Sequence, residues 1–510
     1  MRNDDAVLRL HASDNVVVSK GDMQAGTELP ENGIILYVTD AIPFGHKIAT
    51  ADIAKDEAVR KYGQTIGFAT CDIAPGQHVH DHNLVFAEFA RDYEFGVDAK
   101  PTKFIPEGER ATFQGIVRAD GRVATRNYLA VITSVNCSAT VARYIADHFR
   151  GPALDQWPNV DGVIALSHGS GCGTASHGEG WDYLRRCIAG YSVHPNIAGT
   201  LLLGLGCEIN QVDSLVDDLG LATGETLHTK TIQAMGGTNA SVREGIACIE
   251  AMLPAADAAK RETVSASHIT LGMECGGSDA FSGVTANPAL GAAADLLVRN
   301  GGTAILGETP EIYGAEHLLI RRAESESVGR KLLERIAWWE DYTKKNGAVV
   351  DNNPTPGNKA GGLTTILEKS LGAAAKGGTS NLVEVYRYAE AVRSKGFVFM
   401  DTPGYDPVSV TGMVAGGANV VCFTTGRGSV FGCKPTPSLK LATNSEMFGR
   451  MQEDMDINCG RIVDGDANVE NLGQEIFELI LRTASGEPSK SEAFGFGDEE
   501  FVPWQVGAIL

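Results

Sequence analysis

The sequence contains no closely spaced cysteine pair of the CxxC type, although 10 of its 510 residues are cysteine. Such pairs are typical of structural zinc sites, so their absence disfavours a structural zinc protein. Long apolar runs are missing too: no segment reaches the length of about 18 residues that would span a bilayer, and residues 1–15 lack the apolar region of an export signal. We therefore expect a cytoplasmic protein whose thiols stay reduced and available to a metal.

Basic residues are few relative to acidic ones. The chain has 43 lysines and arginines against 64 aspartates and glutamates, which gives a formal net charge of −21. No basic face is left to neutralise phosphates, and this argues against a nucleic-acid partner. A small anionic substrate is compatible with this charge where local arginine, lysine, metal or backbone N–H groups supply positive potential.

Internal repeats and a dinucleotide-binding turn are also absent. The glycine-rich segments HGSGCG and GRGSVFG fail the GxGxxG spacing, which disfavours a nucleotide-binding Rossmann domain. A chain of 510 residues with 43% hydrophobic content is too long for one core. We expect two or three domains.

The pattern along the chain indicates where these domains lie. Residues 1–90 contain short apolar runs separated by turns, which predicts a small all-β module. Residues 91–112 are polar and contain proline and glycine, as in a linker. Strands alternate with helical segments in residues 113–260 and again in residues 261–510, the pattern of α/β domains. The predicted fold class is therefore α/β behind an all-β module.

Four apolar, β-branched runs each end in a cysteine, at Cys137, Cys172, Cys207 and Cys275. Such runs are typical of strands buried on both faces of a sheet, and α/β sheets bind ligands at the carboxyl ends of their strands. We expect the four thiols to converge on one metal site. Buried free cysteine is also a common small hydrophobic residue, and this core interpretation is given to the cysteines without such a loop: Cys187, Cys248, Cys422, Cys433 and Cys459.

Histidines gather in the all-β module. His78, His80 and His82 alternate within GQHVHDHN, so an extended strand would present all three on one face. This arrangement suits metal or anion binding, and we predict that His78 and His80 contact the substrate; the alternative is a polar strand edge. His46 in FGHK is a weaker candidate of the same kind.

The middle region offers candidates for catalysis and substrate binding. His168 lies four residues before Cys172 in a glycine-rich loop whose N–H groups could hold a carboxylate, so it is a candidate ligand or base; a turn histidine is the alternative. Arg126 and Asn127 in GRVATRN are candidate substrate contacts, although a salt bridge would explain the arginine equally well.

The C-terminal region supplies acids and cations. Glu308 follows the predicted strand TAILG and is a candidate base, as carboxylates at strand ends often are. Lys359 stands in the loop NPTPGNKAGG, which is rich in proline and glycine and could position it for an anion or as a base. Arg427 and Thr425 in TTGRGS could clamp a carboxylate. For each, loop architecture is the alternative.

Together these parts suit elimination of water from a hydroxy acid. A base must remove the weakly acidic proton next to a carboxylate while cations and hydrogen-bond donors stabilise the enolate-like charge. A Lewis-acid metal on the leaving hydroxyl would lower the barrier further. Cysteine ligands favour iron, as a single ion or in an iron–sulfur cluster, over magnesium.

Several long segments, in the right order, resemble the altronate and galactarate dehydratase family. They are GIVRADGRVATRNYLAVITSVNCS, HGSGCG, HPNIAGTLLLGLGCEINQ, ECGGSDAFSGVTANPALG, NPTPGNKAGGLTTILEKSLG, FTTGRGS and DMDINCG, and they cover nearly the whole chain. GQHVHDHN, GLGCEINQ and PEIYGAEHLL are more similar to the altronate branch. HGSGCG departs from the HTYGCS-like form of that branch, which leaves galactarate as the alternative sugar acid.

The resemblance implies dehydration of D-altronate to 2-dehydro-3-deoxy-D-gluconate with Fe²⁺. It also implies an N-terminal SAF (β-clip) domain, a middle domain able to form a homodimer interface, and a Rossmann-like parallel sheet in the C-terminal domain. Two other activities stay open: a lyase that expels sulfite from a sulfolactate-like acid, and a non-catalytic sugar-acid binding protein, disfavoured because binding modules rarely need thiols beside bases.

Overall fold

The computed structural model describes residues 6–31, 34–89 and 91–507. Residues 1–5, part of the N-terminal segment considered above for an export signal, lie outside the described residues. Within the described part of the chain, none of the helices has both the length and the apolar character needed to cross a membrane.

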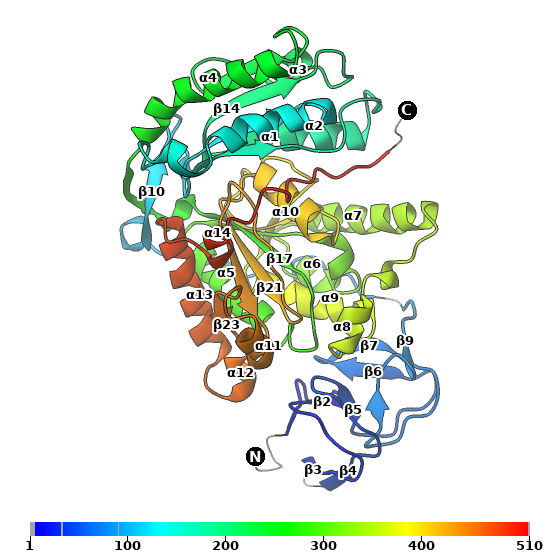
Figure 1. Ribbon diagram of the computed structural model, residues 1–510. Coiled ribbons are helices and arrows are strands. Elements are labelled where there is room, and N and C mark those ends of the chain that lie inside the picture. Colours follow the sequence, from blue (N-terminus) through cyan, green and yellow to red (C-terminus); the bar gives the residue numbers. More distant parts are fainter. Residues whose placement is uncertain (1–5, 32–33, 90, 508–510) are drawn as a thin grey trace.

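The N-terminal module, residues 6–89, consists of short antiparallel strands (blue in Figure 1). They form three small sheets in the orders β1-β2-β5-β8, β3-β4 and β6-β7-β9. Valines and isoleucines such as Val16, Ile48 and Ile66 fill its interior. The strands are β1 (Val7–Leu8), β2 (Val16–Ser19), β3 (Glu28–Glu31), β4 (Ile34–Tyr37), β5 (Lys47–Ala49), β6 (Ala58–Lys61), β7 (Gln64–Ala69), β8 (His78–Val79) and β9 (Leu84–Val85).

The predicted linker lies as a strap along the C-terminal domain. Its backbone N–H groups at Gly96 and Ile105 donate to the carbonyls of Ile320 and Arg299. Its regular structure is the short 3-10 helix η2 (Glu107–Glu109), and β10 begins at Thr112. The linker is therefore hydrogen-bonded in place, and the N-terminal module has a fixed path to its docking position.

The second domain has a parallel sheet in the order β13-β12-β14-β15, covered by helices on both faces. β12 is buried along its whole length because apolar helices pack on both sides of it. A second, antiparallel sheet, β11-β10-β16, joins this domain to the C-terminal one. The elements are β10 (Thr112–Val117), β11 (Val123–Ala124), β12 (Tyr128–Thr133), α1 (Ala139–His148), β13 (Gly162–Leu166), α2 (Glu179–Ser192), β14 (Ile197–Gly204), α3 (Val212–Leu219), β15 (Leu227–Thr231), α4 (Thr238–Asp257) and β16 (Arg261–Ser265).

The C-terminal domain is built on a parallel sheet in the order β19-β20-β18-β17-β21-β22-β23. Its strands are β17 (Thr270–Cys275), β18 (Thr303–Leu306), β19 (Leu382–Tyr386), β20 (Gly396–Met400), β21 (Val420–Thr425), β22 (Ser438–Ala442) and β23 (Ile457–Asn458). Its helices are α5 (Ala286–Arg299), α6 (Glu316–Ile320), α7 (Glu326–Lys345), α8 (Pro356–Ala360), α9 (Ile366–Ala374), α10 (Asp406–Ala415), α11 (Ser445–Arg450), α12 (Arg461–Asp464), α13 (Val469–Ala484) and α14 (Lys490–Ala493).

The three parts are arranged in a row. Figure 1 shows the N-terminal module and the second domain at opposite ends of the C-terminal domain, with the module next to α8 and α9. The final segment of the chain runs back to the second domain, where Trp504 stacks on Tyr183 with ring centroids 5.2 Å apart. The predicted fold class, α/β behind a small all-β domain, is confirmed.

Candidate functional site

The N-terminal module docks on the C-terminal domain through a buried ion cluster. Lys47 Nζ lies 2.9 Å from Glu368 Oε2, and Lys61 Nζ lies 2.9 Å from Glu368 Oε1. All three side chains are at most 1% exposed. Lys47 also donates to the carbonyl of Gly362 at 2.7 Å. In this buried interface one carboxylate binds two ammonium groups. Because a buried charge without a partner is costly, these ion pairs fix how the N-terminal module docks on the C-terminal domain.

Histidines of the module face the C-terminal domain beside this cluster. His46 Nδ1 lies 3.0 Å from His78 Nε2, and the rings of His46 and His80 stack with centroids 4.7 Å apart. His82 continues the group, 5.3 Å from the His78 ring, but is exposed. β8 ends at Val79, so a strand followed by a turn brings the rings together, where the sequence predicted one extended strand.

The histidines contact the end of α8, the short helix in which Lys359 lies, where the sequence predicted a loop. His80 Nε2 donates to the carbonyl of Lys359 at 2.9 Å, and His46 Nε2 lies 3.4 Å from the carbonyl of Ala360. At Gly361, the residue that follows α8, a Cβ would lie 3.2 Å from Arg427 Cδ. The structure thus brings the predicted residues His78, His80, Lys359 and Arg427 to one seam between two domains, together with His46.

Burial shapes the protonation of these imidazoles. Burial, followed by the charge of His80, lowers the pKa of His46 to about 4. Burial, followed by the neighbouring His46, lowers the pKa of His78 to about 3. Both rings are therefore neutral at physiological pH, the form in which imidazole offers a lone pair to a metal or a proton.

Cys275 belongs to a second, fully buried polar group inside the C-terminal domain. Cys275 Sγ lies 3.3 Å from Glu311 Oε2 and 3.8 Å from Glu308 Oε1. Cys275, Glu308 and Glu311 offer three ligand atoms within 4.8 Å of one another. Two lysines already neutralise the carboxylates: Lys376 Nζ lies 2.5 Å from Glu308 Oε2, and Lys369 Nζ lies 2.8 Å from Glu311 Oε1.

Burial and the two lysines set the protonation of this group. Burial, with the charge of Glu308 added, raises the pKa of Cys275 well above its ordinary value, so the thiol is neutral. Burial also raises the pKa of Glu308. In Glu311 burial acts in the same direction, but the lysines outweigh it and the pKa is lowered. Ammonium groups thus already balance the charge of both carboxylates, and the metal-ligand role of Cys275 stays a prediction.

The other three predicted metal ligands lie elsewhere. Cys137, Cys172 and Cys207 are exposed and follow β12, β13 and β14 of the second domain. Their strands belong to a different sheet from β17, which ends at Cys275. The expectation that all four thiols converge on one site is therefore corrected: each lies at or just beyond a strand end, but two separate sheets carry them.

His168, predicted as catalytic, is a buried structural residue. Its Nε2 donates to the carbonyl of Thr133 at 3.0 Å, and its Nδ1 accepts from the backbone N–H of Ser170 at 3.2 Å. Burial lowers its pKa to about 4. Because both ring nitrogens have backbone partners, the histidine shapes its loop and has no free nitrogen for catalysis.

Arg126 and Asn127, predicted as substrate contacts, are structural residues: Arg126 joins the second domain to the C-terminal one, and Asn127 ties segments of the second domain together. Arg126 binds Glu492 through two nitrogens, at 2.6 and 2.8 Å, and is 3% exposed. Asn127 donates to the carbonyls of Asn159 and Ala256. Both stand before β12, at the amino end of its sheet, whereas ligands of α/β sheets bind at the carboxyl end.

Thr425 shapes the turn that presents Arg427. Its Oγ1 accepts from the backbone N–H of Gly428 at 3.1 Å, and the side chain is buried. Arg427 itself is exposed. Thr425 and Arg427 were predicted to clamp a carboxylate together. Only the guanidinium of Arg427 is accessible to solvent and to a substrate.

The seam depends on residues that the sequence analysis did not select. Lys47, Lys61 and Glu368 dock the module, while Lys369 and Lys376 neutralise the buried glutamates. A signal was present: Glu368 and Lys369 stand within the apolar helical run ILEKSLGAAA, and Lys47 interrupts buried strand residues. Charged residues at core positions nearly always have buried partners.

Comparison with known proteins places the whole chain in a family. Three family profiles match successive parts: altronate/galactarate dehydratase SAF domain at residues 5–87, D-galactarate dehydratase/altronate hydrolase second domain at residues 115–257, and D-galactarate/altronate dehydratase C-terminal domain at residues 266–509. Altronate dehydratase of Bacillus subtilis is 34% identical over 506 residues, which is 99% of both chains.

Two further relatives show the breadth of the match. Galactarate dehydratase (L-threo-forming) of Escherichia coli is 38% identical over 488 residues, 94% of this chain and 93% of its own. The (2R)-sulfolactate sulfo-lyase subunit beta of Chromohalobacter salexigens is 31% identical over 395 residues, 77% of this chain and 96% of its own. The full-length matches confirm the predicted hydro-lyase class and its sugar-acid type of substrate. The chain belongs to the altronate/galactarate dehydratase family.

Proposed function

We propose that the protein dehydrates D-altronate to 2-dehydro-3-deoxy-D-gluconate at the seam between the N-terminal module and the C-terminal domain. The observation that carries the location is that three imidazoles, the end of α8 with Lys359, and Arg427 meet there. A sugar acid needs a cation for its carboxylate and donors for its hydroxyls, and this seam supplies both.

We propose further that the seam holds Fe²⁺ through His46 and His78. Nitrogen ligands about 2.1 Å from one ion at right angles to each other are about 3 Å apart, and His46 Nδ1 and His78 Nε2 are separated by 3.0 Å. Imidazole is a good ligand for iron. Bound there, iron would supply Lewis-acid polarisation of a substrate oxygen.

The surrounding side chains take distinct parts in the elimination. Arg427 binds the substrate carboxylate through two N–H groups. Lys359 accepts the proton from the carbon next to the carboxylate and, once protonated, stabilises the enolate-like charge. It then gives this proton to the hydroxyl on the following carbon, which leaves as water, and the enol product tautomerises to the 2-keto acid. His80 is a positioning residue, because its Nε2–H fixes the carbonyl of Lys359. Glu308 is fully buried and paired with Lys376, so we assign it no proton transfer.

Galactarate is the second candidate substrate. The galactarate dehydratase of Escherichia coli shares 38% of aligned residues with this chain, against 34% for the altronate dehydratase of Bacillus subtilis. Galactarate has a carboxylate at each end, so a second cation is needed for it. The homodimer and the cytoplasmic location stay predictions from the sequence.

An anaerobic assay of the iron-loaded protein tests the substrate. We expect 2-keto-acid from D-altronate, less from galactarate and none from (2R)-sulfolactate. Equal or greater turnover of galactarate would assign the second candidate, and turnover of neither sugar acid by iron-loaded protein would contradict both.

Two sets of variants test the site. We expect Arg427→Ala to reduce kcat/KM by about 10²–10³-fold, mostly through KM, with exposed Arg450→Ala as the matched control. In protein loaded with Fe²⁺ and no sulfide, we expect His46→Ala/His78→Ala to lose the bound iron by metal analysis, and exposed His11→Ala to keep it. Iron retained by the double variant would contradict the histidine site.

A further inference from the structure

Three exposed thiols of the second domain stand on neighbouring loops. β12 lies between β13 and β14 in a parallel sheet, so the carboxyl ends of the three strands are adjacent. Cys137, Cys172 and Cys207 each follow within a few residues of one of these ends. All three are exposed, whereas the other strand-end thiol, Cys275, is buried in the C-terminal domain.

Hydrogen bonds tie these loops to one another. The backbone N–H of Asn136, next to Cys137, donates to the carbonyl of Ser170 at 2.9 Å. The backbone N–H of Asn210 donates to the carbonyl of Gly171, next to Cys172, at 3.2 Å, and its side chain donates to the carbonyl of Ser134 at 3.0 Å. The loop with Cys172 is thus joined directly to the loops with Cys137 and Cys207, so the three cysteines stand on one connected face of the domain.

The Cys207 loop is held rigidly by a buried carboxylate. Glu208 accepts hydrogen bonds from Gly206 N at 2.6 Å, Leu205 N at 3.1 Å and Ser134 Oγ at 2.7 Å. Gln233 Nε2 then donates to Cys207 Sγ at 3.2 Å. Hydrogen bonds from surrounding groups orient metal-bound thiolates, and an N–H that donates to the sulfur adjusts the reduction potential of the bound metal.

The three thiols do not stand close enough together to be ligands of one tetrahedral ion. Sulfur atoms 2.3 Å from one tetrahedral ion lie about 3.8 Å apart. Among the described residues, the one group of three ligand atoms within 4.8 Å is Cys275, Glu308 and Glu311, so at least one pair of the exposed thiols is more widely spaced. In an iron–sulfur cube each cysteine binds a different iron, which spreads the sulfurs.

We propose that Cys137, Cys172 and Cys207 bind a four-iron, four-sulfide cluster on the second domain. Three cysteines occupy three irons, and the fourth iron takes a non-protein oxygen or nitrogen ligand. Assembly balances without an oxidant when two ferrous ions, two ferric ions and four sulfides are supplied: each of three irons gains one bond to a cysteine sulfur, and each thiol releases one proton to solvent.

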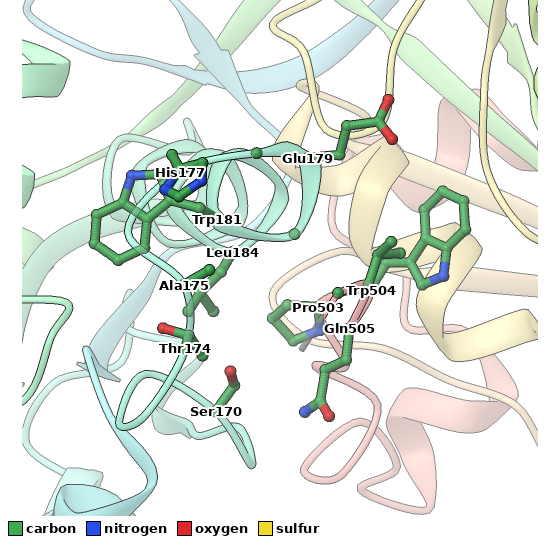
Figure 2. Close-up of a pocket in the computed structure, with 14 residues that line it drawn as sticks. Ser170, Thr174, Ala175, His177, Glu179, Trp181, Leu184, Pro503, Trp504 and Gln505 are labelled. Atoms are coloured by element: carbon green, nitrogen blue, oxygen red, sulfur yellow. The ribbon is translucent and has the colours of Figure 1, made fainter. Parts of the chain in front are cut away.

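A cavity next to this face gives a small ligand room near the cluster. Its volume is about 320 Å³, and Figure 2 shows it between the Cys172 loop and the C-terminal segment of the chain. Ser170 and Thr174, two residues to either side of Cys172, line one side of it, and Gln505 lines the other. The hydroxyl and amide groups there suit a polar ligand on the open iron.

Reconstitution of the full-length protein tests the cluster. The protein is loaded anaerobically with the iron mixture and sulfide given above, desalted, and assayed for iron and acid-labile sulfide. We expect about four sulfides per chain in the wild type and in the exposed control Cys71→Ala, and almost none in Cys137→Ala/Cys172→Ala/Cys207→Ala. Circular dichroism checks that the triple variant is folded.

Alkylation of the wild-type protein gives a measurement that needs no variant. We expect reconstitution to protect Cys137, Cys172 and Cys207 from iodoacetamide at least tenfold, while Cys71 stays reactive, as read by mass spectrometry. Unprotected thiols, or iron bound without sulfide, would overturn the proposal.

The sulfide measurement does not depend on the proposed iron site of His46 and His78. Iron held by His46 and His78 carries no sulfide and survives in the triple cysteine variant. If the triple cysteine variant loses sulfide but keeps one iron and altronate turnover, both the cluster and the seam site are supported. If one of the two proposals is wrong, the measurement that tests the other is unaffected.

Discussion

In the C-terminal domain, Cys275 ends β17 inside a buried network of two glutamates and two lysines, whereas in the second domain Cys137, Cys172 and Cys207 follow their strands on exposed loops. Both groups occupy the same position relative to a parallel sheet. The difference lies in what covers the strand ends. In the C-terminal domain α9 and the 3-10 helix η8 (Ala375–Gly377) bring Lys369 and Lys376 over them. A strand end is a ligand position only where the layer above it is open.

The first test of this comparison is thiol reactivity. In the metal-free native protein we expect Cys137, Cys172 and Cys207 to react with iodoacetamide about 10³-fold faster than Cys275, because a core thiol reacts only after opening of the structure. Time-resolved peptide mass spectrometry measures each rate. Equal rates for Cys275 and Cys207 would show that the C-terminal strand ends are not closed.

The second test removes the charge that closes the C-terminal group. Lys376→Met leaves Glu308 buried without its cation, and we expect a loss of about 3–5 kcal/mol in the free energy of unfolding, measured by urea titration. Adding Glu308→Gln should recover part of that loss. Exposed Lys331→Met, which breaks a surface pair with Glu384, should cost under about 1 kcal/mol. Similar losses in both lysine variants would refute the charge-balanced network.

The third test measures how stability depends on pH through Asp406, a carboxyl that lies beside the buried group of Cys275, Glu308 and Glu311. Burial, followed by the charge of Glu308, raises the pKa of Asp406 to about 7. The folded state therefore favours the protonated form, so this group's stabilising contribution is complete below the unfolded pKa of about 3.9 and is lost as the pH rises through 7.

Asp406→Asn should remove this dependence. We expect the variant to gain about 2–4 kcal/mol over the wild type between pH 4 and pH 8, as measured by urea titration. A constant difference between the two proteins across that range would contradict the assignment.

The smallest expected effect is on the reactivity of Cys207, one of the three exposed thiols. Gln233→Leu removes the N–H that donates to Cys207 Sγ. A hydrogen bond of about 1 kcal/mol corresponds to a factor of about five, so we expect alkylation of Cys207 to slow two- to fivefold because its thiolate is less stabilised. Cys137 is the internal control, and a parallel change at Cys137 would point to a general loosening of the loops.

The sequence predicted correctly where these strands end. It did not predict which residues surround the strand ends. The runs ending in Cys137, Cys172, Cys207 and Cys275 gave β12, β13, β14 and β17, because a buried parallel strand needs an unbroken apolar run. Local pattern did not show that these strands belong to two sheets. It also placed His168 among catalytic candidates, whereas its two nitrogens bind backbone groups 35 residues and two residues away.

What the sequence determined by itself is the order of elements, the all-β module ahead of two α/β regions, and the residue types at the turns. These follow from apolar periodicity and from glycine and proline, which act over a few residues. Only the tertiary structure decided which charges meet. Lys47 and Glu368 are 321 residues apart in the chain, and their pairing selects the histidine seam. Electrostatic partners depend on distance in space and on burial, and neither is encoded in the spacing of residues along the chain.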